Sequence, residues 1–380
     1  MAKTFRVGLI GYRFMGRAHS SAWRQAPRFF PLKANVELHT ICGRHAASLQ
    51  AARAQLGWQH ATTDWQEIVE SPLIDIVDIS VPPNLHAEIA IAAAKSGKHI
   101  LCEKVFATTV KEAEQMLAAA NRAKVVHMVC HNYRRIPAIA LAKRMITESA
   151  LGRIYHFRAR YAQDRLADPD FPLDWRMQKE TSGSGVHSDI NSHIIDLGRY
   201  LVGEFKDVLG LLNTFVPERP LADSLAKGAR KMGKVNVPDS AAFLGWMENG
   251  VMANLEATRY ALGRKNHIEI EINGSQGSIY FDFEDMNRLK FYNGADPVDR
   301  RGFRDIYVTE RDGVHPYAGH WWPPGHGLGY EQTFVHTVAD FVNACAEGKS
   351  VQPTFEDGLK NQRVLAAVEE SAQKGKWAKV

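Results

Sequence analysis

The feature that most constrains the fold is a regular alternation of short apolar runs with helix-like segments over the first third of the chain. The apolar runs are "FRVGLIG" at 5–11, "VELHTICG" at 36–43, "IDIVDISVP" at 74–82, "KHILCEKV" at 98–105 and "VVHMVCHNY" at 125–133. Helices are predicted over 85–97 and over 109–124, the second opening with a capping box from Thr109 to Glu112. Buried strands that alternate with helices of this length are typical of a doubly wound parallel sheet.

The rest of the chain shows the pattern of an antiparallel sheet. Residues 153–163 alternate between apolar and polar, and 240–261 and 267–283 are predicted hairpins with turns at Glu-Asn-Gly and Gly-Ser-Gln-Gly. Residues 218–239 are expected to form a loop or lid without regular structure, and helices return from about Tyr330 and Phe355. We therefore predict an α/β chain with a parallel-sheet domain at 1–134 and an α+β domain with a large, mostly antiparallel sheet at 135–380.

Composition and charge limit the functional classes. The net charge is +5 and the basic residues are scattered, which argues against a nucleic-acid partner. The four cysteines include no C-x-x-C pair, so we expect buried thiols in a reducing compartment. No apolar run is long enough to cross a membrane, and the one after the N-terminus is too short for a signal peptide. These observations predict a cytoplasmic protein without a membrane partner.

The turn after the first predicted strand, "GLIGYRFMGRAH" at 8–19, resembles a dinucleotide-binding turn with one departure. The pattern G-x-G-x-x-G would place glycines at 11, 13 and 16, but position 13 is Arg. In this setting Gly11 would allow the tight turn and Gly16 the close packing of helix on strand, while the helix N-terminus offers N–H groups to a pyrophosphate. Arg13 would add a bond to phosphate, or it faces solvent.

The ends of two other predicted strands bear on cofactor and chemistry. The second strand ends at Cys42-Gly43-Arg44 without the carboxylate that usually binds the adenosine ribose, so nothing there would repel a 2′-phosphate. Arg44 would bind such a phosphate or stack on adenine, or it is a solvated loop residue. Glu103 and Lys104 end another strand at the edge where ligands of open α/β sheets bind. The alternative for them is a surface ion pair.

The segment "SGSGVHSDINSHIIDLGRYL" turns from glycine- and serine-rich into a helix. Asp189, His193 and Asp196 are spaced to share one face of that helix. A histidine beside a carboxylate is the arrangement of a general base with an orienting partner, and the alternative is a helix cap with a core histidine. A metal site from His187, Asp189 and His193 lacks a recognised ligand spacing, and we predict no metal.

Taken together, these motifs resemble the Gfo/Idh/MocA oxidoreductase family over nearly the whole chain. The resemblance is carried by the turn at 8–19, "VPPNLHAEIAIAAAKSGKHILCEK" at 81–104, "HNYRR" at 131–135, D-x-x-x-H-x-x-D at 189–196, and "TFEDGLKNQRVLAAVEESAQKGK" at 354–376. Within the family, "YAQD" at 161–164, "WRMQK" at 175–179 and "VGEF" at 202–205 are most similar to the inositol and levoglucosan dehydrogenases.

The resemblance implies a Rossmann domain with a nicotinamide cofactor, a second domain that binds a sugar or cyclitol and carries the oligomer interface on its sheet, and three catalytic residues, Lys104, Asp189 and His193. We expect NAD, with NADP left open, and a homodimer or homotetramer. The expected cofactor-binding residues are Gly11, Arg13, Phe14, Met15, Arg44, Val81, Pro83, Asn84, His86, Glu103, Lys104, Trp175 and Arg176. The expected substrate-binding residues are Lys104, Tyr133, Tyr161, Asp164, Arg176, Asp189 and His193.

The chain departs from the family pattern at Arg13 and at Val105, which stands where the family has proline after the lysine. Because a cis bond before a non-proline residue costs about 2.5–4 kcal/mol, we expect a trans Lys104–Val105 peptide. The main hypothesis is an NAD(P)-dependent dehydrogenase acting on a secondary hydroxyl of a sugar, anhydrosugar or cyclitol. The first alternative is an oxidoreductive glycosidase on the same fold, for which an anionic sugar is one candidate substrate. A non-catalytic NAD(P)-binding sensor is the second, and the intact Lys104, Asp189 and His193 argue against it.

Overall fold

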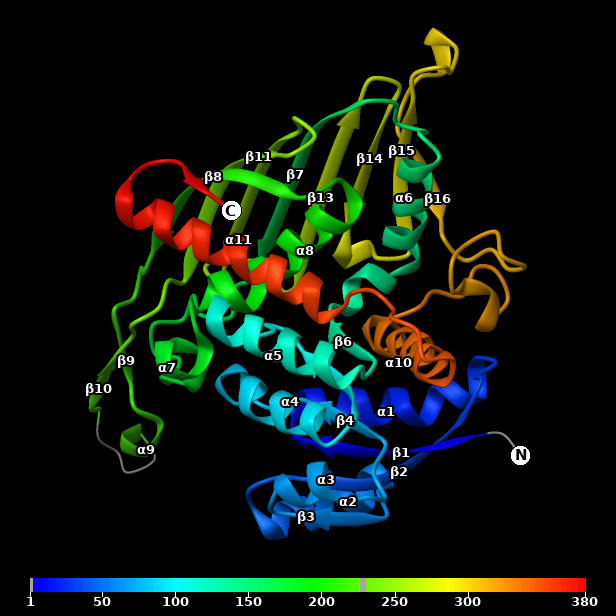
Figure 1. Cartoon of the computed structure of the whole chain (residues 1–380). Helices are drawn as coiled ribbons and strands as arrows, with labels where there is room; N and C mark the ends of the chain where they lie inside the picture. The colour runs from blue at the N-terminus through cyan, green and yellow to red at the C-terminus, as the bar shows by residue number, and fades with distance from the viewer. Residues whose placement is uncertain (1–2, 226–229) are drawn as a thin grey trace. The chain divides into compact units, whose positions relative to one another are not determined.

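The computed structural model describes residues 3–225 and 230–380, and Figure 1 traces their helices and strands. The chain divides into two units. The first contains the chain up to Arg135 together with Leu328–Lys360, and the second contains Ile136–Gly327 and the chain from Asn361 onward. From the sequence, we expected all of 135–380 to form one domain. The difference arises because a segment that returns to an earlier domain carries no local sign of its destination in its apolar pattern.

The first unit is built on a six-stranded sheet whose pairings are all parallel, in the order β3-β2-β1-β4-β5-β6. The predicted doubly wound parallel sheet is therefore confirmed. Its strands are β1 (Thr4–Ile10), β2 (Asn35–Cys42), β3 (His60–Thr62), β4 (Ile76–Ile79), β5 (His99–Glu103) and β6 (His127–Cys130). The strand order reverses between β1 and β4, and ligands of such sheets bind at this point, outside the carboxyl ends of the strands.

Helices cover both faces of this sheet. The helices of the first unit are α1 (Phe14–Phe29), α2 (Ala46–Leu56), α3 (Gln66–Glu70), α4 (His86–Lys95), α5 (Val110–Ala123) and α10 (Tyr330–Glu347), with the start of α11 (Phe355–Lys374). Apolar residues of α3, α4 and α5 form one core with Val77 and Ile79 of β4. Asp78, between those two, bonds to His19 of α1, so α1 lies against the opposite face, with α10 packed beside it.

The second unit is built on a nine-stranded sheet in the order β16-β15-β14-β13-β7-β12-β11-β8-β17. Only the pair β7–β12 is parallel, which confirms the predicted mostly antiparallel sheet and both hairpins. Its strands are β7 (Ile154–Ala162), β8 (Phe205–Asn213), β11 (Ser240–Met247), β12 (Met252–Thr258), β13 (His267–Gly274), β14 (Gly277–Asp282), β15 (Arg288–Asn293), β16 (Arg304–Tyr307) and β17 (Ala378–Lys379).

The expectation of no regular structure over 218–239 was wrong for part of this segment. There β9 (Glu218–Pro220) pairs antiparallel with β10 (Met232–Lys234), and α9 (Ala222–Leu225) lies between them in the sequence. Strands of three residues are too short to show an alternating pattern, so the sequence carried no signal for them. Residues 226–229, also part of the expected loop, lie outside the described residues.

One face of the nine-stranded sheet is covered by helices and the other is partly exposed. The remaining helices of this unit are α6 (Pro137–Thr147), α7 (Lys179–Ser182) and α8 (Ser192–Leu201). Glycines allow the helices to approach closely: a Cβ on Gly198 would lie 2.8 Å from the Phe157 ring, and one on Gly210 would lie 2.8 Å from Val368 of α11. The uncovered face carries the exposed apolar side chains of Leu211, Leu244, Trp246 and Met252.

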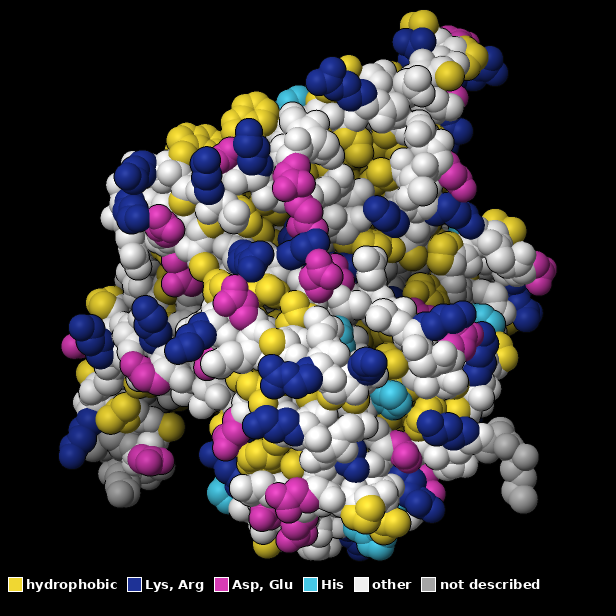
Figure 2. All heavy atoms as spheres, in the orientation of Figure 1, with side chains coloured by type: hydrophobic (Ala, Val, Ile, Leu, Met, Phe, Trp, Pro, Cys, Tyr) yellow, Lys and Arg dark blue, Asp and Glu magenta, His cyan; other side chains and the backbone are white. Residues whose placement is uncertain are grey.

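The surface mixes charges of both signs. Figure 2 shows Lys and Arg side chains interspersed with Asp and Glu over the face that it presents. This agrees with the scattered basic residues of the sequence. Among the described residues, no helix combines the length and the apolar character that crossing a membrane requires.

The N-terminus of α5 offers a test of local stability. The Thr109 hydroxyl accepts from the Glu112 N–H at 3.2 Å, and the Glu112 carboxylate accepts from the Thr109 N–H at 3.0 Å. Thr109→Ala should lower the free energy of unfolding by about 1 kcal/mol, because the Glu112 N–H in the first turn loses its side-chain acceptor. Chemical denaturation followed by circular dichroism measures this. Thr109→Ser should retain stability, as should Lys111→Ala, and an equal loss in all three variants would contradict the capping argument.

Candidate active site

The turn between β1 and α1 is built on backbone contacts that only glycine allows. Gly11 has a φ of +110°, and a Cβ there would lie 2.5 Å from the Ser80 carbonyl oxygen at the end of β4. A Cβ on Gly16 would lie 2.1 Å from the Gly11 carbonyl oxygen. The two predicted roles, a tight turn at Gly11 and close helix packing at Gly16, therefore describe the local geometry correctly.

The N-terminus of α1 emerges from this turn. The helix begins at Phe14, and the Arg13 side chain, which precedes it, is exposed and makes no capping hydrogen bond. The Phe14 ring is 64% exposed and stacks at 6.3 Å on Tyr330 of α10. First-turn N–H groups without a side-chain cap, next to a backbone cradle that a Cβ would fill, fit the pyrophosphate of a dinucleotide. Arg13, Phe14 and Met15 thus lie where the sequence analysis expected them, at the carboxyl edge of the sheet.

Other expected cofactor residues lie on the same edge with differing exposure. Arg44 follows β2 and is exposed, and Asn84 is exposed just before α4. Val81 is half-buried, and Pro83 is buried. Neither Cys42 nor Gly43 supplies a carboxylate at the end of β2, as the sequence indicated.

His86 and Glu103, two further expected cofactor residues, have buried side chains. The His86 ring is fully buried, with Nδ1 at 3.0 Å from the Val105 carbonyl oxygen and Nε2 at 2.9 Å from that of Val81. Burial lowers the pKa of His86. The His86 ring thus joins the loops that follow β4 and β5.

Lys104 lies directly after β5 and is half-buried. Its N–H donates to the Glu103 Oε2 at 3.1 Å. The Lys104–Val105 peptide is cis, so the expectation of a trans bond was wrong. That expectation rested on the preference of an isolated peptide, which takes no account of the tertiary contacts of a buried Val105.

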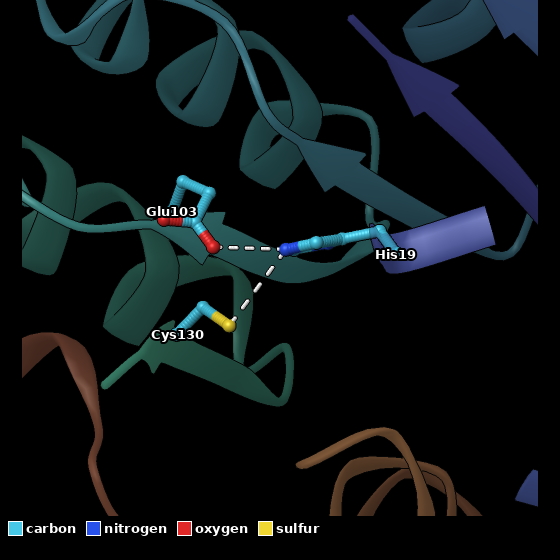
Figure 3. Close-up of side chains that lie close together, drawn as sticks. All are labelled: His19, Glu103 and Cys130. Atoms are coloured by element: carbon cyan, nitrogen blue, oxygen red, sulfur yellow. Dashed lines mark hydrogen bonds and ion pairs between the residues drawn. The ribbon is translucent and has the colours of Figure 1, made fainter. Parts of the chain in front are cut away.

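Beside Lys104, the structure reveals a buried charged network that the sequence analysis did not predict (Figure 3). His19 of α1 places Nδ1 at 2.9 Å from the Asp78 carboxylate and Nε2 at 2.8 Å from the Glu103 Oε1. Cys130 Sγ lies 3.8 Å from the same Nε2. Burial opposes the imidazolium, but Asp78 outweighs it and holds the pKa of His19 well above its ordinary value. Burial likewise opposes the Glu103 carboxylate, but the bond from His19 keeps its pKa below the ordinary value.

The segment "HNYRR" after β6 is buried and holds the returning part of the first unit. Tyr133 is 4% exposed, and its ring lies 6.4 Å from that of Tyr330. Arg134 pairs with Asp357 at 3.2 Å, and Arg135 pairs with Asp340 at 2.8 Å. The "HNYRR" segment, one of those that carry the family resemblance, therefore also links the end of β6 to α10 and α11.

In the second unit, Asp189 lies in a single π-helical turn, His187–Asn191, that leads into α8. The prediction of a shared helical face assumed 3.6 residues per turn, and that geometry does not apply through a π turn. His187 is fully buried, with Nε2 3.0 Å from the Leu365 carbonyl oxygen and Nδ1 accepting from the Asn191 amide at 2.9 Å. Burial lowers its pKa to about 4, so His187 is a neutral core histidine. Such turns occur often at functional sites.

Two arginines surround the Asp189 carboxylate. Arg259, whose side chain is 4% exposed, donates to the Asp189 Oδ2, and Arg176 Nε lies 3.7 Å from the same oxygen. The Arg176 guanidinium also lies over the Trp175 ring, 4.1 Å from its centroid. The structure therefore brings the expected residues Trp175, Arg176 and Asp189 together. Arg259 also belongs to this group. It was not predicted from the sequence, because a single arginine after a strand is not part of any recognised motif.

The remaining expected residues of this unit lie in two settings. His193 is 5% exposed, and its ring lies 5.9 Å from that of Tyr161. The Tyr161 hydroxyl donates to the Asn266 Oδ1 at 2.7 Å. Asp164 pairs at 2.5 Å with Lys265, whose side chain is 81% exposed. Tyr161 and His193 thus lie near one another, whereas Asp164 is engaged by a surface lysine.

Comparisons with known proteins agree with this geometry. Residues 5–131 match a family model described as the oxidoreductase family with an NAD-binding Rossmann fold, and residues 139–280 match the GFO/IDH/MocA C-terminal domain. Levoglucosan dehydrogenase of Pseudarthrobacter phenanthrenivorans is 45% identical, over 100% of this chain and 98% of its own.

Solved structures match over the same length. An oxidoreductase domain protein from Kribbella flavida superposes with a TM-score of 0.95 at 49% identity, covering 100% of this chain and 99% of its own. Levoglucosan dehydrogenase in complex with NADH and levoglucosan superposes with a TM-score of 0.95 at 45% identity and the same coverage. With both domain models matched in order and a relative of this identity over its full length, the chain belongs to the GFO/IDH/MocA oxidoreductase family.

Proposed function

We propose that this oxidoreductase is an NAD-dependent dehydrogenase that oxidises a secondary hydroxyl of an anhydrosugar, with levoglucosan as the first substrate to test. The observation that carries the proposal is the 45% identity to levoglucosan dehydrogenase over the full length of both chains. The structure of that relative with NADH and levoglucosan bound supports the choice of cofactor and of substrate. Lys104, Asp189 and His193, which the family resemblance implies as catalytic residues, are all present in this chain.

The residues that would hold the dinucleotide are those of the carboxyl edge in the first unit. The Gly11 turn and the N-terminus of α1 suit the pyrophosphate, and exposed Arg44 suits the adenosine end. When bound, the nicotinamide supplies the hydride acceptor of the reaction. No carboxylate follows β2 to repel the 2′-phosphate of NADP, so the preference for NAD rests on the relative.

The proposed reacting groups have distinct roles. His193 accepts the proton of the substrate hydroxyl. Asp189 orients the His193 ring and relays the proton, and Lys104 provides a positive charge that lowers the pKa of the hydroxyl. Arg259 donates to the Asp189 carboxylate and Arg176 lies beside the same oxygen, so the two guanidinium groups fix the direction of this carboxylate, which supports its orienting role. The half-buried Trp175 offers aromatic surface to a sugar ring, and Tyr133, Tyr161 and Asp164 remain proposed substrate contacts.

We also propose a homodimer or homotetramer formed through the uncovered face of the nine-stranded sheet, and a cytoplasmic location. On that face Leu211, Leu244, Trp246 and Met252 are 75%, 45%, 45% and 43% exposed. Pairing between β8, β11 and β12 places them on neighbouring positions of one surface. Contiguous exposed apolar side chains on a sheet are typical of a protein interface.

Turnover with levoglucosan tests the proposed activity. Purified protein should reduce NAD⁺ in proportion to the levoglucosan consumed, with a higher kcat/KM than with NADP⁺, as followed by NADH absorbance. The redox-neutral glycosidase hypothesis predicts the opposite: release of an aglycone from a glycoside without net NADH. Tight NADH binding without turnover of any sugar or glycoside would instead favour the sensor.

The assignment of His193 predicts a specific kinetic loss. His193→Ala should lower kcat by about 10²–10⁴-fold, the usual contribution of a positioned general base, while the Kd for NADH stays nearly unchanged. Lys104→Ala should lower kcat at least as much. Stopped-assay turnover and NADH fluorescence titration measure the two quantities. The matched control is His60→Ala, at an exposed histidine of β3, and an equal kcat for the control and the His193 variant would refute the assignment.

The proposed interface predicts a change of molar mass in solution. Leu244→Glu combined with Trp246→Glu should shift the protein to a smaller species in size-exclusion chromatography with light scattering, because two charges would be buried in an apolar contact. Leu262→Glu is the control, since Leu262 is 82% exposed in a loop. An unchanged mass in the double variant would show that the oligomer, if present, uses another surface.

A further inference from the structure

We propose that His19 is a positioning residue for Lys104. His19 is bonded to both Asp78 and Glu103 and thereby fixes the Glu103 carboxylate. That carboxylate accepts the Lys104 N–H and so sets the direction of the lysine. The inference rests on the proposed function only in giving Lys104 a part in the reaction. His19 belongs to the opening motif at 8–19, but its side chain is only 1% exposed. A side chain buried to this extent does not contact a cofactor, so the position of His19 needs another explanation.

A continuous chain of hydrogen bonds leads from α1 to Lys104. Asp78 accepts from Trp23 Nε1 at 2.6 Å and from His19 Nδ1 at 2.9 Å. His19 Nε2 donates to Glu103 Oε1 at 2.8 Å, and the second oxygen of Glu103 accepts from the Lys104 N–H at 3.1 Å. Both oxygens of Glu103 are therefore used, one by the histidine and one by the lysine main chain. The Glu103 carboxylate cannot rotate without breaking one of them.

The charges around His19 make this link strong. Asp78 of β4 and Glu103 of β5 are 0% and 3% exposed, so a cation between them is needed to offset two buried carboxylates. The other groups that face the ring are Cys130 of β6, whose thiol has its pKa raised to about 12 by burial, and the Phe334 ring of α10 at 5.4 Å. The ring thus has two anionic partners and otherwise a neutral thiol and an aromatic ring, which favours the imidazolium as a donor at both nitrogens.

A metal ion is the competing occupant, because His19, Glu103 and Cys130 together offer three ligand atoms. The separation of 2.8 Å between His19 Nε2 and Glu103 Oε1 is that of a hydrogen bond. Two ligands of a tetrahedral zinc ion at about 2.0–2.1 Å would instead lie roughly 3.3 Å apart. The geometry therefore holds a proton between these atoms, and metal analysis of the purified protein tests the point.

The first test reads the position of Lys104 without reference to activity. Lysines of the folded protein are reductively dimethylated with ¹³C-formaldehyde and a borane reductant, and the Lys104 resonance is assigned by its loss in Lys104→Arg. In His19→Gln this resonance should move toward that of solvated lysines while the others stay in place. Trp23→Phe is the control. It removes another hydrogen-bond donor to Asp78 in the same buried region, and it should leave the Lys104 resonance unchanged. An unmoved resonance in His19→Gln would overturn the proposal.

The second test is a double-mutant cycle on kcat. His19→Gln should lower kcat by up to about 100-fold, the effect of a reacting group displaced by about 1 Å, with the Kd for NADH unchanged. In a Lys104→Met background the same change should have little further effect. An equal fold-loss in both backgrounds would show a general structural role and refute the inference. If His19→Gln does not fold, Glu103→Gln breaks the same link and is subject to the same two readouts.

If the wild-type protein turns over no sugar, the proposed function fails while the resonance of Lys104 still decides the inference. One stoichiometric equivalent of bound zinc that is lost in His19→Gln would also overturn it, because the cluster would then be a metal site.

Discussion

The approach of the Gly11 backbone to Ser80 is the contact on which the architecture of the first unit depends. At this point the ends of β1 and β4, where the strand order reverses, meet the start of α1, and a Cβ at Gly11 or Gly16 would overlap a carbonyl oxygen. Because no side chain fits, the turn leaves main-chain N–H groups exposed at the carboxyl edge of the sheet. The same absence of side chains that permits the packing also creates the cradle for a dinucleotide.

In both units the residues with proposed chemical roles lie next to ion pairs of buried or partly buried side chains. In the first, the imidazolium of His19 balances Asp78 and Glu103 next to Lys104. In the second, Arg259 and Arg176 balance Asp189 in a π-helical turn. A buried ion pair adds little net stability, but removal of one partner is costly, so such pairs restrict the carboxylates to one orientation. Asp189 is thus held by Arg259, and Glu103 by His19, two contacts that the sequence motifs did not indicate.

Strand-end position indicated which segments lie at the carboxyl edge of the sheet, but not which of their side chains are exposed there. Arg13, Phe14, Arg44 and Asn84 are exposed at the expected edge, but His86 and Glu103 from the same motifs point inward. In a parallel strand successive side chains alternate between the faces, and at the strand end a change of one residue decides between solvent and core. A sequence motif therefore identifies the residues of such a loop, but not the direction in which each side chain points.

The sequence by itself determined the class of fold, the two sheets with their strand types, the glycine turn, and the family through Lys104, Asp189 and His193. These follow from local physics: periodicity of burial, turn residues and the N–H groups of a helix start. Only the tertiary structure decided that 328–360 belongs with the first unit, that Asp189 lies in a π turn beside Arg259, and that His19 joins Asp78 to Glu103. Each of these depends on partners that lie 59 to 84 residues apart, or on a segment that returns from the far end of the chain, and no local pattern records which distant side chain a buried charge will meet.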